Sequence, residues 1–151
     1  MHAHDVTRFE ELPDEIASLV EAGHTAYESS HGVACDYKPF SLVLRDGTGA
    51  VSGVLSAYTA YSEIYVDDLW VAEEARGKGY GKALLEALEA QFTGEGYNNV
   101  NLVTSAFQAV EFYKACGFEV EFVRENRVNP RLTKTFFIKY FREAGQHRGI
   151  L

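Results

Sequence analysis

Residues 67–82 decide the fold, and they read Asp-Asp-Leu-Trp-Val-Ala-Glu-Glu-Ala-Arg-Gly-Lys-Gly-Tyr-Gly-Lys. The apolar run that ends at Val71 predicts a β-strand, and the leucines after residue 82 recur at the spacing of a helix. Between these two elements, Gly77, Gly79 and Gly81 stand at alternate positions. Backbone N–H groups at a helix start are unpaired and carry partial positive charge, so this turn predicts an anion site, first of all for phosphate.

Two familiar phosphate-binding motifs do not fit this turn. A P-loop requires Gly-x-x-x-x-Gly-Lys-Ser/Thr, but Arg76 occupies the position of the first glycine and Ala83 replaces the hydroxyl residue. The dinucleotide-binding pattern Gly-x-Gly-x-x-Gly fails because Lys82 stands where the last glycine belongs. Residues 78–81 match the opening of an RNA-recognition signature, but the aromatic strand that should follow is missing. What remains is Arg-x-x-Gly-x-Gly after a Leu-x-Val strand end.

That pattern resembles the acetyl-CoA-binding motif of the GNAT family of N-acetyltransferases. A second region, residues 104–118, resembles a later motif of the same family, in which a strand leads to a short helix with Phe-Tyr and then to Gly-Phe. The two motifs stand in the family's order, and the similarity covers residues 40–141.

The resemblance implies an α/β domain of the GNAT-type acyl-CoA N-acyltransferase fold, with residues 1–151 forming one domain. Its sheet is expected to be mixed and mostly antiparallel, splayed between its central parallel strands and flanked by helices. Periodicity and turn residues predict the individual elements. They are a helix from residue 12 to about residue 27, strands at 40–44, 51–60 and 64–71, a helix at 82–92, a strand at 100–104, a helix at 106–116, and strands at 118–122 and 133–141.

The resemblance also implies acetyl-CoA as the acyl-donor cosubstrate and gives its binding residues. The backbone of Leu69 and Val71 is expected to bond the pantetheine amides, and the glycine-rich turn is expected to hold the diphosphate. Gln108 stands where many members have an Asn that contacts the pantetheine arm. The predicted residues of the turn are Arg76, Gly77, Lys78, Gly79, Tyr80, Gly81 and Lys82. No metal site is expected, since no cluster of His, Cys and acidic residues has ligand spacing.

Direct acetyl transfer requires a base for the amine, a donor for the developing oxyanion and an acid for the leaving thiolate. Tyr113 matches the family's catalytic tyrosine and is the predicted acid, although a tyrosine at this helical spacing also suits a core. Asp67 and Asp68 are the candidate bases, with burial expected to raise their pKa; binding the acceptor without proton transfer is the alternative role. Residues 65–71 resemble the corresponding strand of polyamine acetyltransferases, in which the proposed base matches Asp67. Strict alternation places Asp67 on the face of Leu69, and a β-bulge would change that assignment.

These residues predict an acetyl-CoA-dependent N-acetyltransferase that acts on a primary amine, which is polyamine-like or belongs to a peptide or protein. A non-catalytic acyl-CoA-binding sensor of the same fold is the alternative. Residues 1–75 carry 14 acidic and 3 basic side chains, whereas residues 76–151 carry 8 acidic and 11 basic ones. This asymmetry suits a cationic acceptor on the N-terminal half and an anionic donor on the C-terminal half. The alternative is a drift in surface composition without functional meaning. The net charge of −8 argues against nucleic acid as a partner.

The remaining predictions concern the cell and the assembly. Cys35 and Cys116 have no metal or redox spacing, and no apolar segment is long enough to enter or cross a membrane, so we expect a cytoplasmic protein without a membrane partner. Strand edges in this fold often pair across a two-fold axis, and a homodimer is therefore among the expected states.

Overall fold

The computed structural model describes residues 4–142, and the chain divides between Cys35 and Asp36 into two units. The first unit contains helix α1 (Asp14–Ser30), whose first turn holds two carboxylates that complement the helix dipole. No residue of α1 is buried, and the apolar side chain of Leu19 is 73% exposed. The helix predicted near the N-terminus is present, and it ends at Ser30 instead of near residue 27.

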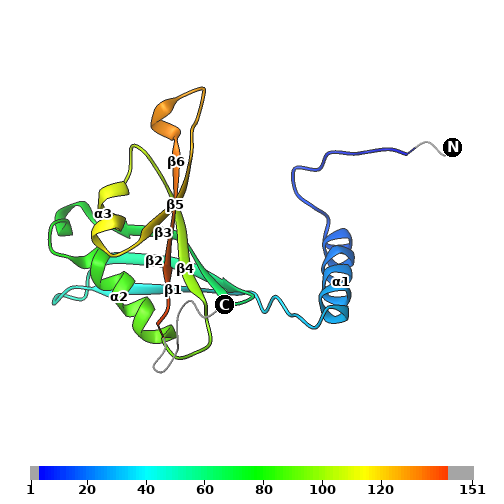
Figure 1. The fold of residues 1–151 in the computed structure, drawn as a ribbon, viewed down its shortest axis with the longest axis horizontal. Helices are drawn as coiled ribbons and strands as arrows, with labels where there is room; N and C mark the ends of the chain where they lie inside the picture. The colour runs from blue at the N-terminus through cyan, green and yellow to red at the C-terminus, as the bar shows by residue number, and fades with distance from the viewer. Residues whose placement is uncertain (1–3, 143–151) are drawn as a thin grey trace, which may run out of the picture. The chain divides into compact units, whose positions relative to one another are not determined.

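The second unit is built on a six-stranded sheet with the strand order β1-β2-β3-β4-β6-β5 (Figure 1). The strands are β1 (Lys38–Arg45), β2 (Val51–Ala60), β3 (Glu63–Val71), β4 (Asn99–Ser105), β5 (Glu119–Arg124) and β6 (Lys134–Tyr140). The helical elements are η1 (Glu73–Ala75), α2 (Tyr80–Phe92), α3 (Val110–Ala115) and η2 (Pro130–Leu132). Strands β3 and β4 are parallel, and every other neighbouring pair is antiparallel. This is the mixed α/β architecture that the sequence predicted.

The hydrophobic core lies on the face of the sheet that α2 and α3 cover (Figure 1). Leu84, Leu85 and Leu88 form the buried stripe of α2, and Leu55 of β2 and Phe137 of β6 are completely buried against them. Full burial of such a side chain contributes about 1.5–3 kcal/mol. The apolar spacing in the sequence of α2 is thus the feature that fixes this helix on the sheet.

The two central parallel strands separate after a short paired segment. Only Glu63–Tyr65 of β3 pairs with Asn99–Asn101 of β4, although β3 continues to Val71 and β4 to Ser105. The remaining halves of both strands therefore do not pair with each other. The splay predicted from the sequence is present, and it leaves backbone N–H and C=O groups facing a gap beside Leu69 and Val71.

A β-bulge interrupts β3 at its two aspartates. Ala57 of β2 pairs with Val66, and the next residue, Ser56, pairs with Asp68, so that Asp67 is the extra residue. Before the bulge Val66 belongs to the core face, and after it Leu69 packs against the same core. The bulge thus reverses the alternation and places both aspartates opposite Ser56, on the face away from the core.

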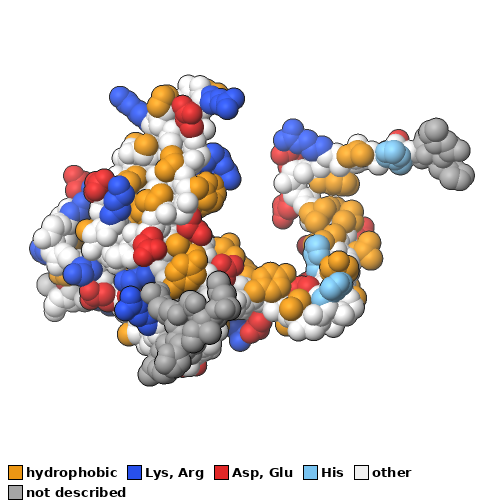
Figure 2. Space-filling model, viewed as in Figure 1, with side chains coloured by type: hydrophobic (Ala, Val, Ile, Leu, Met, Phe, Trp, Pro, Cys, Tyr) orange, Lys and Arg blue, Asp and Glu red, His pale blue; other side chains and the backbone are white. Residues whose placement is uncertain are grey.

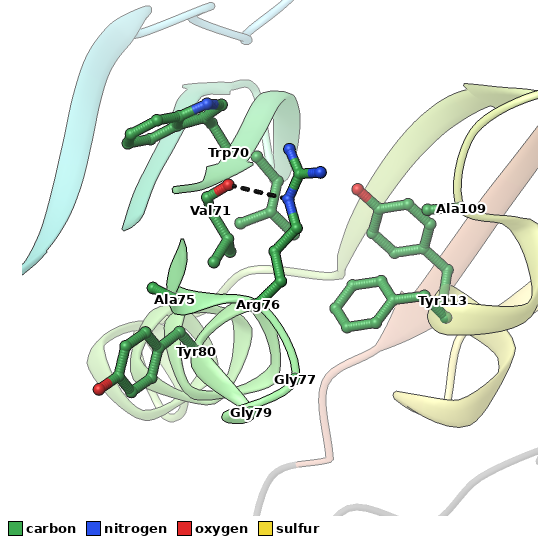
Figure 3. A pocket seen from close by; sticks show the side chains of 12 residues that line it. Trp70, Val71, Ala75, Arg76, Gly77, Gly79, Tyr80, Ala109 and Tyr113 are labelled. Atoms are coloured by element: carbon green, nitrogen blue, oxygen red, sulfur yellow. Dashed lines mark hydrogen bonds between the residues drawn. The ribbon is translucent and has the colours of Figure 1, made fainter. Parts of the chain in front are cut away.

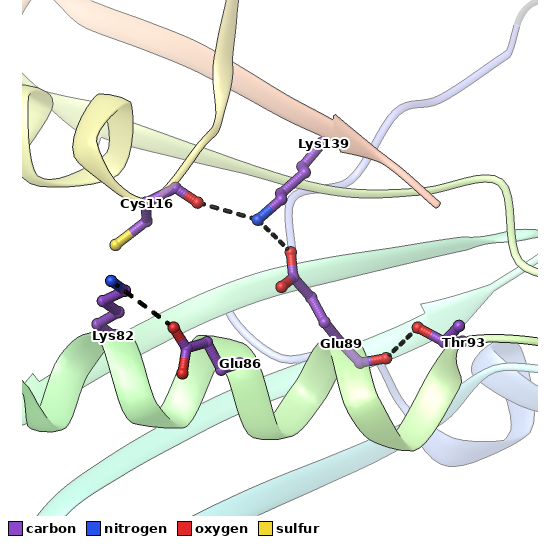
Figure 4. A network of polar contacts seen from close by, with 6 residues as sticks. All are labelled: Lys82, Glu86, Glu89, Thr93, Cys116 and Lys139. Carbon is purple, nitrogen blue, oxygen red and sulfur yellow. Dashed lines mark hydrogen bonds and ion pairs between the residues drawn. The ribbon is translucent and has the colours of Figure 1, made fainter. Parts of the chain in front are cut away.

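One lysine connects the last strand to both helices of the core face (Figure 4). The Lys139 Nζ of β6 lies 2.7 Å from Glu89 Oε1 of α2 and donates a hydrogen bond of 3.0 Å to the backbone carbonyl of Cys116. The side chains of Lys139 and Glu89 are 33% and 25% exposed, so solvent screens this ion pair only in part. The contact holds the end of α3, and with it the preceding Tyr113, in a defined position relative to α2.

The helix predicted at residues 106–116 is wrong in its first turn, because α3 begins only at Val110. The backbone N–H groups of Ala106 and Phe107 donate instead to the carbonyls of Thr133 and Arg131, at 2.8 and 3.3 Å. These bonds to the β5–β6 hairpin replace the helical hydrogen bonds that the sequence pattern suggested.

Candidate functional site

The open end of the splay leads into a cavity of about 550 Å³ (Figure 3). Its walls come from the end of β3, the turn before α2, the first residues of α2, and α3. The lining residues are Leu69, Trp70, Val71, Ala75, Arg76, Gly77, Gly79, Tyr80, Gly81, Ala109, Phe112 and Tyr113. Cavities of roughly 300–1,000 Å³ are typical of small-ligand sites. Most residues predicted for the donor site therefore surround one cavity, which we call the donor cavity.

The turn before α2 presents unobstructed backbone to the donor cavity. Gly77 and Gly79 have φ angles of +81° and +79°, and a Cβ at either position would meet no atom within 4 Å. No side chain caps the first turn of α2. The uncapped N–H groups and the helix dipole thus favour an anion here, as the sequence predicted for a phosphate group.

Gly81 has a different role from the other two glycines. Gly81 is buried in the first turn of α2. A Cβ at this position would lie only 2.9 Å from Cζ of Phe112 in α3. The missing side chain allows α2 and α3 to pack closely. Gly81 lines the donor cavity, but it is required first for packing.

The cations predicted around this turn are not equivalent. Arg76 lines the donor cavity, and its Nε donates a 3.3 Å hydrogen bond to the carbonyl of Val71 (Figure 3). Lys78 and Lys82 do not line the donor cavity, and Lys82 Nζ lies 3.8 Å from Glu86 Oε1. Arg76 is therefore the cation that the fold brings into the cavity.

Tyr113 lies across the donor cavity from Arg76 (Figure 3). Its side chain is only 9% exposed and packs edge-to-face on Phe112 and Phe118. Burial, followed by the charges of Cys116 and Asp68, raises the pKa of Tyr113 to about 12. The hydroxyl therefore keeps its proton at neutral pH, as an acid must before it reacts.

A second cavity, of about 160 Å³, adjoins the donor cavity and shares Leu69, Ala109 and Tyr113 with it. It is lined by Val66, Asp67, Asp68, Leu69, Leu102, Val103, Thr104, Gln108, Ala109 and Tyr113. Both predicted bases are thus in the wall of the same small space as the predicted acid. We call this space the carboxylate cavity.

The aspartates lack one property that the sequence analysis assigned to them. Both side chains are exposed, so the expected burial is wrong for Asp67 and for Asp68. The β-bulge brings both onto one face, where strict alternation would have separated them. Only Asp68 is among the groups whose charge acts on Tyr113.

Gln108 lines the carboxylate cavity and not the donor cavity. Its Oε1 accepts hydrogen bonds from the backbone N–H of Ser105, at 2.9 Å, and from the Thr104 hydroxyl, at 3.4 Å. Since the oxygen is held by an N–H donor, the orientation of the amide is fixed and its NH₂ group is left to donate elsewhere.

Four residues of the donor cavity were not predicted to belong to it. They are Trp70, Ala75, Ala109 and Phe112. Trp70 is 46% exposed on β3 beside Val71. Alternation along β3 would have indicated its exposure, but the approach of α3 to the turn is a tertiary contact without a local signal.

Neither a metal cluster nor a membrane-spanning helix occurs in the part of the chain that the structure describes. Residues 4–142 contain no group of three or more His, Cys, Asp or Glu side chains able to hold a metal ion. None of the helices in this range combines the length and the apolar character needed to cross a bilayer.

Fold and site together define an acetyltransferase domain, and the chain belongs to the acetyltransferase (GNAT) family, whose sequence model matches residues 6–118. An acetyltransferase from Bacillus cereus has 26% sequence identity and a TM-score of 0.73, with 89% of this chain and 98% of that chain covered. A proposed acetyltransferase from Agrobacterium tumefaciens has 22% identity and a TM-score of 0.75, with 91% and 100% covered. The ribosomal-protein-S18-alanine N-acetyltransferase of Escherichia coli shares the fold at 18% identity and a TM-score of 0.61, with 89% and 94% covered. No curated protein matches the sequence.

Proposed function

We propose that this protein is an N-acetyltransferase that moves the acetyl group of acetyl-CoA directly to a primary amine. The observation that carries the proposal is that Tyr113 belongs to the walls of two adjoining cavities. One cavity contains the anion-binding turn before α2, and the other contains Asp67 and Asp68. A donor with phosphate groups and an acceptor with a positive charge suit these two sides.

The donor cavity fits acetyl-CoA in charge and in shape. Gly77 and Gly79 leave open backbone above the start of α2, and Arg76 adds a full positive charge inside the cavity. The part of β3 that does not pair with β4 offers backbone groups to an extended chain with amides. We assign the diphosphate to the turn and the pantetheine arm to the strand.

The acceptor side is acidic, which favours an amine that is protonated in solution. Asp67 and Asp68 line the carboxylate cavity without a basic side chain among its walls. Polyamine-like molecules and the amines of peptides or proteins both meet this requirement. Among the solved structures with this fold, the Escherichia coli enzyme acts on an alanine of a ribosomal protein.

The proposed reaction uses the described residues as follows. Acetyl-CoA supplies the acetyl group as a thioester, which an unprotonated amine attacks at the carbonyl carbon. Asp67 or Asp68 accepts the proton that the ammonium form of the acceptor loses before the attack, directly or through one water molecule, and passes it to solvent. The nitrogen loses its second proton to solvent after the C–N bond has formed. As the new C–N bond replaces the C–S bond, the Tyr113 hydroxyl donates its proton to the departing thiolate and is reprotonated from solvent. The products are an N-acetyl amine and the free thiol.

The test is the release of free thiol from acetyl-CoA in the presence of spermidine, an aminoglycoside, amino acids and lysine peptides. Release above the rate without acceptor, lowered in Tyr113→Phe, supports the proposal. Tight acetyl-CoA binding in calorimetry with no release on any amine, and with Tyr113→Phe binding like the parent, supports the sensor alternative and contradicts the proposal.

Assembly and compartment belong to the same proposal. Strands β1 and β5 are the two edges of the sheet among the described residues, and a homodimer formed along one of them is expected. The two free cysteines are consistent with a reducing, cytoplasmic environment. Sedimentation equilibrium tests the dimer, and cell fractionation tests the compartment.

A further inference from the structure

The turn between β5 and β6 gathers positive charge on a chain that is acidic overall. Residues 124–134, which we call the basic hairpin tip, contain four cations and one carboxylate, whereas the whole chain has a net charge of −8. The cations are Arg124, Arg127, Arg131 and Lys134. Figure 2 shows Lys and Arg side chains at this projecting end of the second unit.

The basic hairpin tip is held in one conformation by its own hydrogen bonds. The Asn126 side chain accepts from the backbone N–H groups of Val128 and Asn129, at 3.0 and 2.8 Å. The Asn129 side chain accepts from the N–H of Arg131 at 3.0 Å, and the Thr133 hydroxyl accepts from the N–H of Asn126 at 3.1 Å. Since the backbone is already ordered, a partner that binds here loses less conformational entropy on the protein side.

Three of the four cations of the tip are free to bind a partner, whereas the Arg124 guanidinium lies over the Phe136 ring at 4.9 Å from its centroid. Arg127, Arg131 and Lys134 are exposed, and none of them forms an ion pair with a residue in the range 4–142. Between them, Val128 is 95% exposed and Leu132 is 42% exposed. Guanidinium groups interleaved with aliphatic side chains are suited to a protein surface that carries carboxylates.

The tip is joined to the carboxylate cavity through the segment that carries Gln108. The N–H of Ala106 donates to the Thr133 carbonyl and the N–H of Phe107 donates to the Arg131 carbonyl, at 2.8 and 3.3 Å. Gln108, the next residue, lines the carboxylate cavity. An acceptor that reaches Asp67 and Asp68 with its amine therefore has its neighbouring groups close to the basic hairpin tip.

We propose that the basic hairpin tip binds acidic side chains of a peptide or protein acceptor, and so selects amines that have acidic neighbours in sequence. This inference rests on the proposed N-acetyltransferase function and narrows its acceptor class. The amine is attracted by the two aspartates, and the carboxylates beside it are attracted by Arg127 and Arg131. A polyamine has no carboxylate that could bind the tip, and its positive charges are repelled by the cations there.

The observations favour a protein partner over a nucleic acid. The surface around the tip includes aliphatic Val128 and Leu132, which cannot stack on bases, and the cavity beside the tip is acidic. The net charge of −8 also opposes binding to a phosphate backbone outside the tip.

The experiment compares two peptides that each have a single free amine, followed either by a run of Asp or by a run of Lys. We expect kcat/KM for the acidic peptide to be about tenfold higher at low ionic strength, and the difference to shrink as salt is added. The double variant Arg127→Glu with Arg131→Glu should lower kcat/KM for the acidic peptide about tenfold through KM, with the KM for acetyl-CoA unchanged. Arg45→Glu, a single charge reversal at an exposed position of β1, is the control for the single variants Arg127→Glu and Arg131→Glu and should behave like the parent.

Equal use of the two peptides, or an equal effect of the single tip variants and the Arg45→Glu control, would overturn the inference while leaving the N-acetyltransferase function intact. Binding of the labelled acidic peptide, measured by fluorescence anisotropy, separates the two proposals, because it reports on the tip without turnover. Anisotropy that is lost in the tip variant supports the inference even if no thiol is released. Displacement of the acidic peptide by single-stranded RNA at lower concentration than by unlabelled peptide would overturn it in favour of a nucleic-acid site.

Discussion

Phe112 occupies the space that any side chain at position 81 would need, since a Cβ on Gly81 would lie 2.9 Å from Phe112 Cζ. The phenyl ring precedes Tyr113 in α3 and packs edge-to-face on it at a centroid distance of 5.1 Å. Gly81 of the glycine-rich turn and Tyr113 therefore both contact the Phe112 ring. A side chain added at Gly81 would displace this ring, and the ring would in turn press on Tyr113, the predicted acid.

Gly81→Ala is accordingly expected to destabilise the fold, because the added methyl group forces the Phe112 ring to move at a cost of about 1–3 kcal/mol, and the gain of at most about 1 kcal/mol in helix propensity offsets this cost only in part. Urea unfolding followed by the fluorescence of Trp70, the single tryptophan, measures this change. Gly47→Ala is the control, since a Cβ there would meet no atom within 4 Å and its backbone does not have a positive φ. Equal stability of the two variants would show that α2 and α3 do not need this close approach.

Tyr113→Phe is expected to change the alkaline stability of the protein. The pKa of Tyr113, about 12 in the folded state, lies above the ordinary tyrosine value of 10.0, so the unfolded state loses the phenolic proton first as pH rises. The stabilisation is complete below pH 10, is lost between pH 10 and 12, and amounts to about 2–3 kcal/mol. The free energy of unfolding should therefore fall more steeply with pH in the parent than in Tyr113→Phe. Parallel curves for the two proteins would contradict the raised pKa of Tyr113 in the folded state.

The sequence predicted most of the elements because their patterns are local. The alternation of Leu42 and Leu44 and the leucine stripe of α2 fix which faces are buried, and β2 was predicted with its observed ends. The Arg-x-x-Gly-x-Gly turn likewise has a local signal, because Gly77 and Gly79 adopt positive φ angles that favour glycine.

The features that the sequence did not predict depend on contacts between distant segments. Residues 106–109 have helical composition, but the N–H groups of Ala106 and Phe107 bond the β5–β6 hairpin. Gly81 belongs to the glycine pattern, yet only the position of Phe112 shows that it is a packing glycine. The β-bulge at Asp67 requires the register with β2, which no pattern within β3 specifies.

Arg76→Ala is expected to weaken acetyl-CoA binding about tenfold, because it removes the cation of the donor cavity and releases the Val71 carbonyl from its 3.3 Å hydrogen bond. The affinity can be followed by calorimetry or by the fluorescence of Trp70, which lines the same cavity. Lys78→Ala removes an exposed charge from the same turn outside the cavity, and is expected to change the affinity less. A larger loss in Lys78→Ala would mean that the diphosphate lies on the outer side of the turn.

The two aspartates differ in how they act on Tyr113, and this difference can be measured. The charge of Asp68 contributes to the raised pKa of Tyr113, and that of Asp67 is not among the contributions. Asp68→Asn should therefore lower the Tyr113 pKa toward its ordinary value, while Asp67→Asn should leave it unchanged. Phenolate absorbance during an alkaline titration, taken as the difference from Tyr113→Phe in each background, isolates this tyrosine from the other eight. The pH–rate profiles of the same variants then identify the base, since losing the base removes the acidic limb of kcat/KM. An unchanged Tyr113 titration in Asp68→Asn would mean that the Asp68 carboxylate does not act on the Tyr113 hydroxyl.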